Sequence, residues 1–214
     1  MNYKVISYFC DVDDSLYYEK CSVDLIRALD EFDLPYEIEK LNSLGSYKLN
    51  CSRKPKYILD KLEEHDCPLL WLDIDTILLK NPVDFAALPD STDIALSTAV
   101  PNLSGIKASP LFFNSTENTK NLLRSWISAV DNNIKNDVEL FDHEPLFGIV
   151  SEYIEKINIG FVGPDYCTWP GQETDSTVIV MGLSDVDSKK ESLRKMGMSE
   201  DVIEWQSVGR QNEN

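Results

Sequence analysis

The chain has 214 residues, which is enough for one α/β domain with a sizeable core, and no repeat or low-complexity segment indicates a second domain. It carries 20 Lys and Arg against 37 Asp and Glu, a formal net charge of −17, so nucleic acids and anionic membrane surfaces would be repelled. We therefore predict a single domain over 1–214 that binds no nucleic acid.

The cysteines and the chain ends predict a compartment. The five cysteines are odd in number and lack C-x-x-C spacing, so they predict neither a disulfide framework nor a zinc site, and free thiols in a reducing compartment are expected. No signal peptide follows Met1, and no apolar run approaches the roughly 20 residues of a membrane span. We expect a cytoplasmic protein without a membrane span. The polar ending 210–214 suggests the N-terminal module of a longer chain.

The first half of the chain alternates strand and helix patterns. In order, they predict a strand over 3–10, a helix that stops at 33–35, a strand over 36–41, a loop over 42–52, a helix from Pro55 and a strand over 69–72. This β-α-β-α-β order is typical of a parallel, nucleotide-binding half-domain.

The second half repeats strands and helices at wider spacing. It predicts strands over 93–98 and 110–114 around a polar loop at 99–108, a helix over 119–130, a helix that opens at 141–147, strands over 157–162 and 177–181, and one or two charged helices in 184–205. The fold class is therefore α/β, with a central sheet flanked by helices.

The stretch 69–82, LLWLDIDTILLKNP, places charge where a buried strand should be. Asp73 and Asp75 would lie at the carboxyl end of the strand, where open α/β sheets bind ligands. Because side chains alternate along a strand, we expect both carboxylates to point the same way, and converging carboxylates suit Mg²⁺ or Mn²⁺. The simpler alternative is that one aspartate caps a turn and the other faces water.

This stretch resembles the Asp-x-Asp segment of GT-A-fold glycosyltransferases, in which an apolar strand ends in the motif and runs into a turn like Leu79-Lys80-Asn81-Pro82. The resemblance covers about 3–183 and is strong at 53–82. It implies a GT-A-like domain whose central sheet is mixed and mostly parallel. This domain would have a nucleotide-binding half (about 1–98), an acceptor half (about 99–183) and C-terminal helices (184–214).

The resemblance also implies an activity. A metal-dependent hexosyltransferase would move a sugar from a UDP-sugar, UDP-glucose or UDP-rhamnose above all, to a glycan acceptor. The whole sequence, which is acidic and shows no membrane anchor, resembles those members of the family that glycosylate a viral capsid protein. This resemblance would place the enzyme in the cytoplasm of the host cell.

The resemblance implies that Asp75 would be the direct metal ligand and that Asp73 would be a second ligand or a contact to the ribose and metal-bound water. Tyr8 is the aromatic residue that would stack on uracil. Arg53 and Lys56 would face the nucleotide, since Arg and Lys are natural donors to phosphates. The lysines on either side of the proline at 55 are equally consistent with plain surface charges.

Two roles have less direct support. GT-A enzymes often take a third metal ligand from a late His, but 178–182 contains none, so His143, Asp175, Asp185 or waters could take its place. Asp142, which precedes a helix, is predicted to be the acid nearest the acceptor or the anomeric carbon. An inverting enzyme would use it as general base, and the structural alternative is a helix N-cap.

Two other functions stay open. The loop after the first strand resembles the nucleophile loop of haloacid-dehalogenase-type phosphatases, with Asp11 as nucleophile and Asp13 as general acid beside Mg²⁺. Ser15 replaces the usual Thr there, and no downstream Gly-Asp-x-x-x-Asp completes the metal site. The third hypothesis is a non-catalytic module that binds a nucleotide sugar. Replacement of Asp73 or Asp75 would have favoured it, but both acids are present.

Overall fold

The structure, a computed structural model, describes residues 3–10, 16–98, 106–138, 143–181 and 194. The loop over 99–105 lies outside the described residues, as do the helices predicted in 184–205 apart from position 194. Within the described part, no helix combines the length and the apolar composition that crossing a bilayer requires.

The core of the protein is a six-stranded sheet in the order β2-β1-β3-β6-β5-β7. Strand β6 runs antiparallel to both of its neighbours, and the other five strands run in one direction. The predicted mixed, mostly parallel sheet is therefore confirmed. The strands are β1 (Lys4–Phe9), β2 (Tyr36–Lys40), β3 (Leu69–Trp71), β5 (Ile94–Thr98), β6 (Ile106–Phe113) and β7 (Ile159–Val162).

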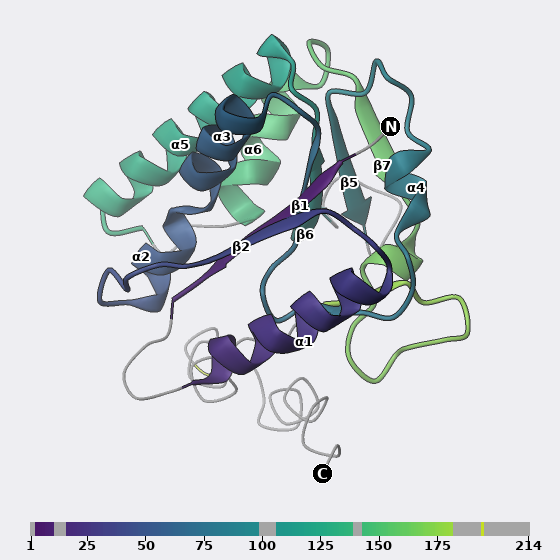
Figure 1. The fold of residues 1–214 in the computed structure, drawn as a ribbon. Coiled ribbons are helices and arrows are strands. Elements are labelled where there is room, and N and C mark those ends of the chain that lie inside the picture. The colour runs from purple at the N-terminus through teal and green to yellow at the C-terminus, as the bar shows by residue number, and fades with distance from the viewer. Residues whose placement is uncertain (1–2, 11–15, 99–105, 139–142, 182–193, 195–214) are drawn as a thin grey trace.

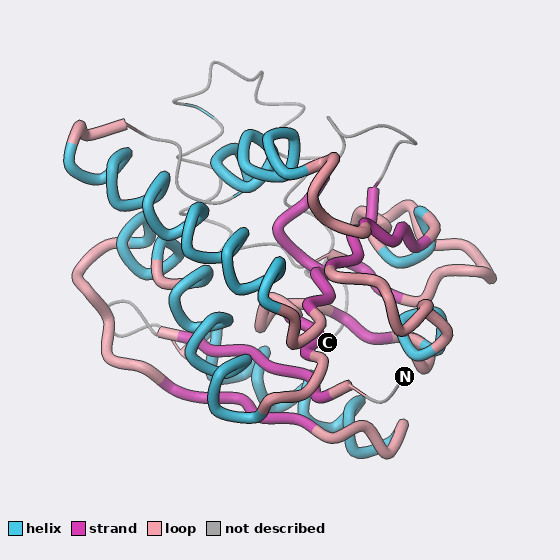
Figure 2. Tube along the Cα trace, turned by 90° about the horizontal axis from the view of Figure 1, so that it is seen from above, coloured by secondary structure: helices cyan, strands magenta, loops and turns pink. Residues whose placement is uncertain are grey.

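Helices cover both faces of this sheet (Figure 1). One face carries α3 (Lys54–His65), α5 (Glu117–Lys135) and α6 (His143–Tyr153), and the other carries α1 (Tyr17–Glu31) and the short α4 (Val83–Ala86). Figure 2 shows the strands from above, with helices outside them. This three-layer arrangement explains why the strands read as apolar runs, because both of their faces are buried.

The alternation of side chains along β3 shows how the two cores are divided. Leu69 and Trp71 join the core beneath α3, α5 and α6, whereas Leu70 and Leu72 join the core on the α1 side. All four side chains are buried almost completely. The strand thereby fixes the position at which the chain emerges at Asp73.

The loop predicted over 42–52 is wrong in its second half, where residues Tyr47–Ser52 form the helix α2. The hydroxyl of Ser46 accepts the N–H of Leu49 at 3.2 Å and caps the helix, and the side chain of Asn50 accepts the N–H of Leu44 at 2.7 Å. A helix of six residues is too short to show a hydrophobic period, so only its cap was visible in the sequence.

Two further strands lie outside the main sheet. Strand β4 (Ile77–Leu78) pairs antiparallel with β8 (Ile179–Val180), so the last predicted strand pairs with the chain that follows Asp75. The N–H of Leu79 donates to the carbonyl of Val178 at 2.9 Å, and Lys80 Nζ donates to the carbonyl of Asp175. The late loop after the 3₁₀ helix η2 (Pro164–Tyr166) is thereby anchored beside the Asp-x-Asp segment.

Strand β6 also begins earlier than predicted. It starts at Ile106, inside the segment expected to be a polar loop, and not at Pro110. Its first residue, Ile106, pairs with Thr98 of β5, and its last residues, 111–113, pair antiparallel with β3. The amino end of β6 therefore lies at the edge of the sheet where β3 ends, which matters for the site.

Candidate active site

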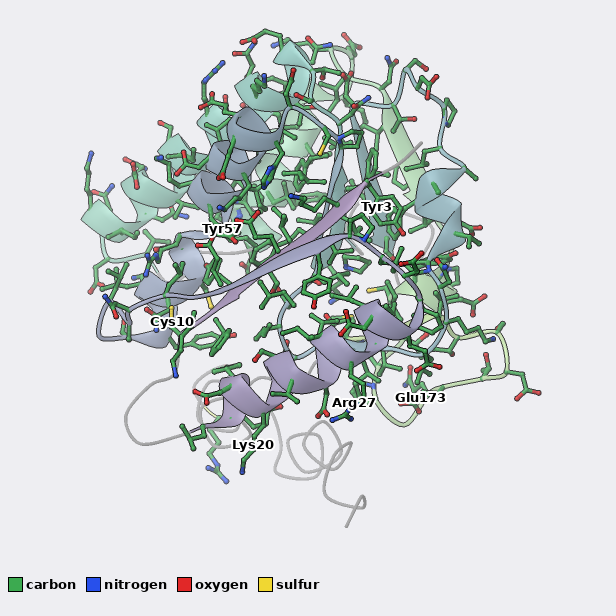
Figure 3. The ribbon with its side chains drawn as sticks, viewed as in Figure 1. Tyr3, Cys10, Lys20, Arg27, Tyr57 and Glu173 are labelled. Carbon is green, nitrogen blue, oxygen red and sulfur yellow. The ribbon has the colours of Figure 1, made fainter. Side chains whose placement is uncertain are left out.

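The candidate site lies at the edge of the sheet where β1 and β3 end. These two strands are parallel neighbours, so their carboxyl ends meet there, and the antiparallel β6 brings its amino end to the same edge. Figure 3 labels Tyr3 and Cys10, which mark the two ends of β1. Asp73 follows β3 by two residues, so its backbone lies at the edge where ligands of α/β sheets bind.

Three elements hold Asp73 in place. Its Oδ1 lies 3.0 Å from Lys54 Nζ at the start of α3 and accepts Trp71 Nε1–H from β3 at 2.9 Å. Its backbone N–H donates to Ser109 Oγ of β6 at 2.8 Å. The side chain is still 37% exposed, so the carboxylate is fixed on one side and accessible on the other.

Lys54 is the buried cation of this site. Its side chain is only 4% exposed, and Nζ also donates to the carbonyl of Ala108 at 3.3 Å and lies 5.5 Å from the centre of the Trp71 ring. Burying an ammonium is costly unless it is paired and hydrogen-bonded, and here it is both. The amino end of α3 adds the positive end of its dipole, so the surroundings of Asp73 favour negative charge.

Asp75 differs from Asp73 in its environment. Strand β3 ends at Trp71, and the N–H of Thr76 donates to the carbonyl of Asp73 at 3.0 Å to close a turn. The alternation that predicted a shared direction for the two carboxylates therefore does not extend to them. Asp75 is 7% exposed and Asp73 is the more accessible of the two, so the motif presents one buried and one open carboxylate.

Tyr8 lies in the floor of the site. It is 8% exposed, its hydroxyl donates to the carbonyl of Asn50 at 2.6 Å, and its ring centre lies 5.0 Å from that of Tyr57 and 5.3 Å from that of Trp71. Tyr57, labelled in Figure 3, donates its own hydroxyl to the carbonyl of Ser7 at 3.1 Å, and burial raises its pKa. Tyr57 is therefore neutral, and the stacking of Tyr8 on uracil stays a prediction.

The two predicted basic residues occupy different positions. Arg53 donates to the carbonyl of Asn42 at 2.7 Å and thereby ties the loop after β2 to the start of α3. Lys56 is 62% exposed and pairs with Asp60 one turn along the helix. Arg53 is the chain neighbour of Lys54, whereas Lys56 lies on the outer surface of α3, and a contact of either predicted residue with the nucleotide stays a prediction.

The other predicted residues are not brought to Asp73 by any described contact. Asp142 lies outside the described residues, immediately before α6, and Asp185, Asp11 and Asp13 also lie outside them. Asp175 is exposed in the late loop. A third metal ligand therefore stays an open prediction, and so does the role of Asp142.

Three contacts of Asp73, with Lys54, Trp71 and Ser109, were not predicted from the sequence. A signal existed for the lysine: it precedes the fully buried Ile58 and Leu62 by one and two helical turns, which places it on the buried face of α3. The contact with Ser109 joins residues 36 positions apart, and no local pattern encodes it.

A second cluster of ionisable side chains lies between β2 and α3. Ligand atoms of Glu37, Glu64 and His65 lie within 4.8 Å of one another, which a metal ion would require. Lys61 Nζ contacts Glu37 and lies 2.6 Å from Glu39 and 2.9 Å from Glu64, so an ammonium already neutralises these carboxylates. We interpret the cluster as an ion-pair network.

The arrangement of strands and helices, with acids at the end of the third strand, defines the fold. The structure has the GT-A-like fold of glycosyltransferases, as the sequence resemblance predicted. No protein-family model matches the sequence, and no curated protein matches it either.

Solved structures give the particular likenesses. The glycosyltransferase involved in the glycosylation of the major capsid of PBCV-1 aligns with a TM-score of 0.63 and 14% identity, over 91% of this chain and 99% of that chain. The glycosyltransferase GlyE of Streptococcus pneumoniae TIGR4 aligns with a TM-score of 0.55 and 15% identity, over 95% of this chain and 63% of that chain. At such low identity these likenesses establish the fold alone.

Proposed function

We propose that the protein is a metal-dependent glycosyltransferase that moves a sugar from a UDP-sugar to a glycan acceptor. The observation that carries this proposal is the position of Asp73 and Asp75 after β3, in a glycosyltransferase fold, with Asp73 fixed by Lys54 yet open to solvent. The fold suggests the class, and the two carboxylates of the motif would supply the metal-binding chemistry.

The oxygen ligands that the two aspartates offer are suited to a divalent cation. Two carboxylates within one turn offer the hard oxygen atoms that Mg²⁺ and Mn²⁺ prefer. We assign Asp75 as the direct ligand and Asp73, one of whose oxygens is engaged by Lys54 and Trp71, as a second ligand or a contact to the ribose. When bound, the cation would supply positive charge that stabilises the departing nucleoside diphosphate.

The protein side chains supply the rest of the proposed donor site. We assign to Lys54 the fixed positive charge beside the diphosphate, in the place predicted for Lys56. Arg53 is its neighbour in the chain and remains a second candidate to face the nucleotide. Tyr8 remains our candidate for contact with the base. Asp142 remains the candidate for the acid that takes the proton from the acceptor hydroxyl in an inverting enzyme.

The donor and acceptor follow from the resemblance. UDP-glucose and UDP-rhamnose are the proposed donors. A glycan on a viral capsid glycoprotein is the proposed acceptor, which the likeness to the glycosyltransferase of the PBCV-1 major capsid supports. The proposed location is the host cytoplasm.

The structure does not test the phosphatase alternative, because Asp11 and Asp13 lie outside the described residues. The non-catalytic alternative is not favoured either, since the open carboxylate of Asp73 and the buried one of Asp75 are both present.

The proposal is tested by incubating the protein with a panel of UDP-sugars and Mn²⁺ and measuring release of UDP. We expect slow release from one UDP-sugar through transfer to water, and its loss in Asp75→Asn. Release that is equal in the variant, or absent for every UDP-sugar, would contradict the proposal.

A further inference from the structure

A cavity of about 190 Å³ lies beside η2 and the loop that leads from η2 to β8. We call it the Trp169 cavity. None of the residues that hold Asp73 lines it, so it is separate from the proposed donor site. Its polar and aromatic lining comes from Asp165, Thr168, Trp169, Gln172, Thr174 and Thr177.

Backbone hydrogen bonds order the wall of the cavity. The N–H of Thr168 donates to the carbonyl of Ile179 at 3.1 Å, and the N–H of Gln172 donates to the carbonyl of Trp169 at 3.0 Å. Gly171 adopts a φ of +84° in this turn, a conformation that favours glycine. The wall is therefore formed by the chain itself, which reduces the ordering cost of binding a ligand there.

The cavity is linked to the Asp73 site through the amino end of β6. Lys107 Nζ lies 5.1 Å from the centre of the Trp169 ring and orients the indole. The next residue, Ala108, accepts from Lys54, and Ser109 accepts the backbone N–H of Asp73. Of three consecutive residues of β6, the first contacts the indole of Trp169, and the next two contact residues of the proposed donor site. Figure 3 labels Glu173 on the loop that carries the cavity.

The lining has the chemistry of a site for a neutral sugar. A pyranose offers C–H groups on the faces of its ring, which suit the negative face of an aromatic side chain, and hydroxyl groups on its rim. Threonine hydroxyls and the amide of Gln172 can both donate to and accept from such hydroxyls.

Charge argues against an anionic ligand. Asp165 is the only charged side chain among the described residues that line the cavity, and the ammonium of Lys107 beside the indole is not part of this lining. The chain as a whole carries a formal charge of −17. The lining thiol of Cys167 is neutral as well, because burial raises its pKa to about 11.

We propose that the Trp169 cavity holds the terminal neutral pyranose of the glycan acceptor, with the indole of Trp169 against the sugar ring and Gln172 and Thr174 bonded to its hydroxyls. The proposal rests on the proposed glycosyltransferase function, because an acceptor subsite has a purpose only beside a donor site. It names the class of acceptor: a neutral sugar residue, not a phosphorylated or carboxylated one.

The test is a titration followed by NMR of the ¹⁵N-labelled protein, whose four tryptophans give four indole N–H signals. Trp169→Phe assigns the signal of the cavity, and Trp71→Phe assigns that of the donor site. The probes are methyl glycosides of glucose, galactose, mannose, xylose, fucose and rhamnose, with methyl glucuronide and inorganic phosphate as anionic controls. A separate titration with UDP and Mg²⁺ tests the donor site in the same sample.

We expect at least one neutral glycoside to shift the Trp169 signal saturably, and both anionic controls to leave it unshifted. Gln172→Ala, in an exposed stretch of the loop, is expected to raise the Kd of that glycoside by about tenfold while UDP binding changes less than about twofold. This variant keeps the test valid if changes at Trp169 itself disturb folding.

The outcomes separate the two proposals. If no neutral glycoside shifts the Trp169 signal, or if glucuronide or phosphate shifts it as strongly, the acceptor subsite is wrong whatever UDP does. If a glycoside shifts Trp169 but UDP leaves every indole signal unchanged, the cavity stands as a sugar site and the donor site is wrong.

Discussion

The ammonium of Lys54 lies 3.0 Å from the carboxylate of Asp73, and the two side chains differ sharply in exposure. The lysine is almost fully buried, whereas the aspartate is more than one third exposed. A buried cation therefore holds the open acid of the Asp-x-Asp segment in a fixed position. This pair explains why a carboxylate can stay at the edge of an apolar sheet in a defined orientation.

Replacement of Lys54 should be far more costly than replacement of Lys56. Lys54→Met removes the buried partner of Asp73 and should lower the free energy of unfolding by about 2 kcal/mol, less than for a fully buried pair because Asp73 regains water. Lys56→Met, on the exposed side of the same helix, should change it by less than about 0.5 kcal/mol. Urea unfolding measures both, and equal losses would contradict the assignment of Lys54.

The hydrogen bond from Trp71 to Asp73 can be isolated with a matched control. Trp71→Phe loses ring volume and the N–H that donates to Asp73, whereas Trp126→Phe loses similar volume from a fully buried indole whose N–H has no hydrogen-bond partner among the described residues. We expect Trp71→Phe to be more destabilising by about 1.5 kcal/mol, the worth of a hydrogen bond to a charged group. Equal losses in the two variants would show that this bond does not stabilise the site.

The ion-pair network of β2 and α3 predicts a dependence on acid. Burial by itself would raise the pKa of Glu37, but hydrogen bonds with Lys61, Glu39 and His65 outweigh it and lower the pKa from 4.5 to about 2. A carboxyl group with a depressed folded-state pKa stabilises the fold above its unfolded pKa, and this stabilisation is lost as the pH falls through the folded value.

The stability difference between wild type and Glu37→Gln should therefore be largest above pH 4.5 and should shrink as the pH falls towards 2. Urea unfolding over this range measures it. In a Lys61→Met background the same comparison should give a smaller and flatter difference, because the main donor to Glu37 is gone. A difference in the wild-type background that stays constant with pH would show that the network does not shift the titration of Glu37.

The contact of β7 with β5 offers a test of the fold away from the site. A Cβ added at Gly160 would lie 2.9 Å from Leu88 Cδ2 and 3.2 Å from Ala95 Cβ. Gly160→Ala should therefore destabilise the protein by about 2 kcal/mol through overpacking. Gly163→Ala, where nothing lies within 4 Å of the added carbon, should be nearly neutral, and the reverse order would contradict the register of β7.

The fold could be predicted from the sequence because its signals are local. Apolar runs such as 69–72 and the amphipathic helix around Leu122 and Trp126 encode their own burial, and the structure confirms both. The short helix α2 and the pairing of β4 with β8 could not be predicted, because two to six residues carry no period.

The candidate site also has a part that the local sequence predicts and a part that only the folded structure brings together. The chain position of Asp73 at the end of its strand follows from the apolar run before it, but the partners of Asp73 come from α3 and β6, which only folding brings together. The shared direction expected for Asp73 and Asp75 assumed an extended strand, and a turn at these residues breaks that assumption.

The central claim is that the Asp73 and Asp75 edge binds a nucleoside diphosphate through a divalent cation, and calorimetric titration of UDP tests it most directly. We predict binding in the presence of Mn²⁺, loss of binding in EDTA, and a rise in Kd of about a hundredfold or more in Asp75→Ala. Equal binding in EDTA would contradict the claim. So would no binding at all, together with hydrolysis of p-nitrophenyl phosphate that Asp11→Asn abolishes.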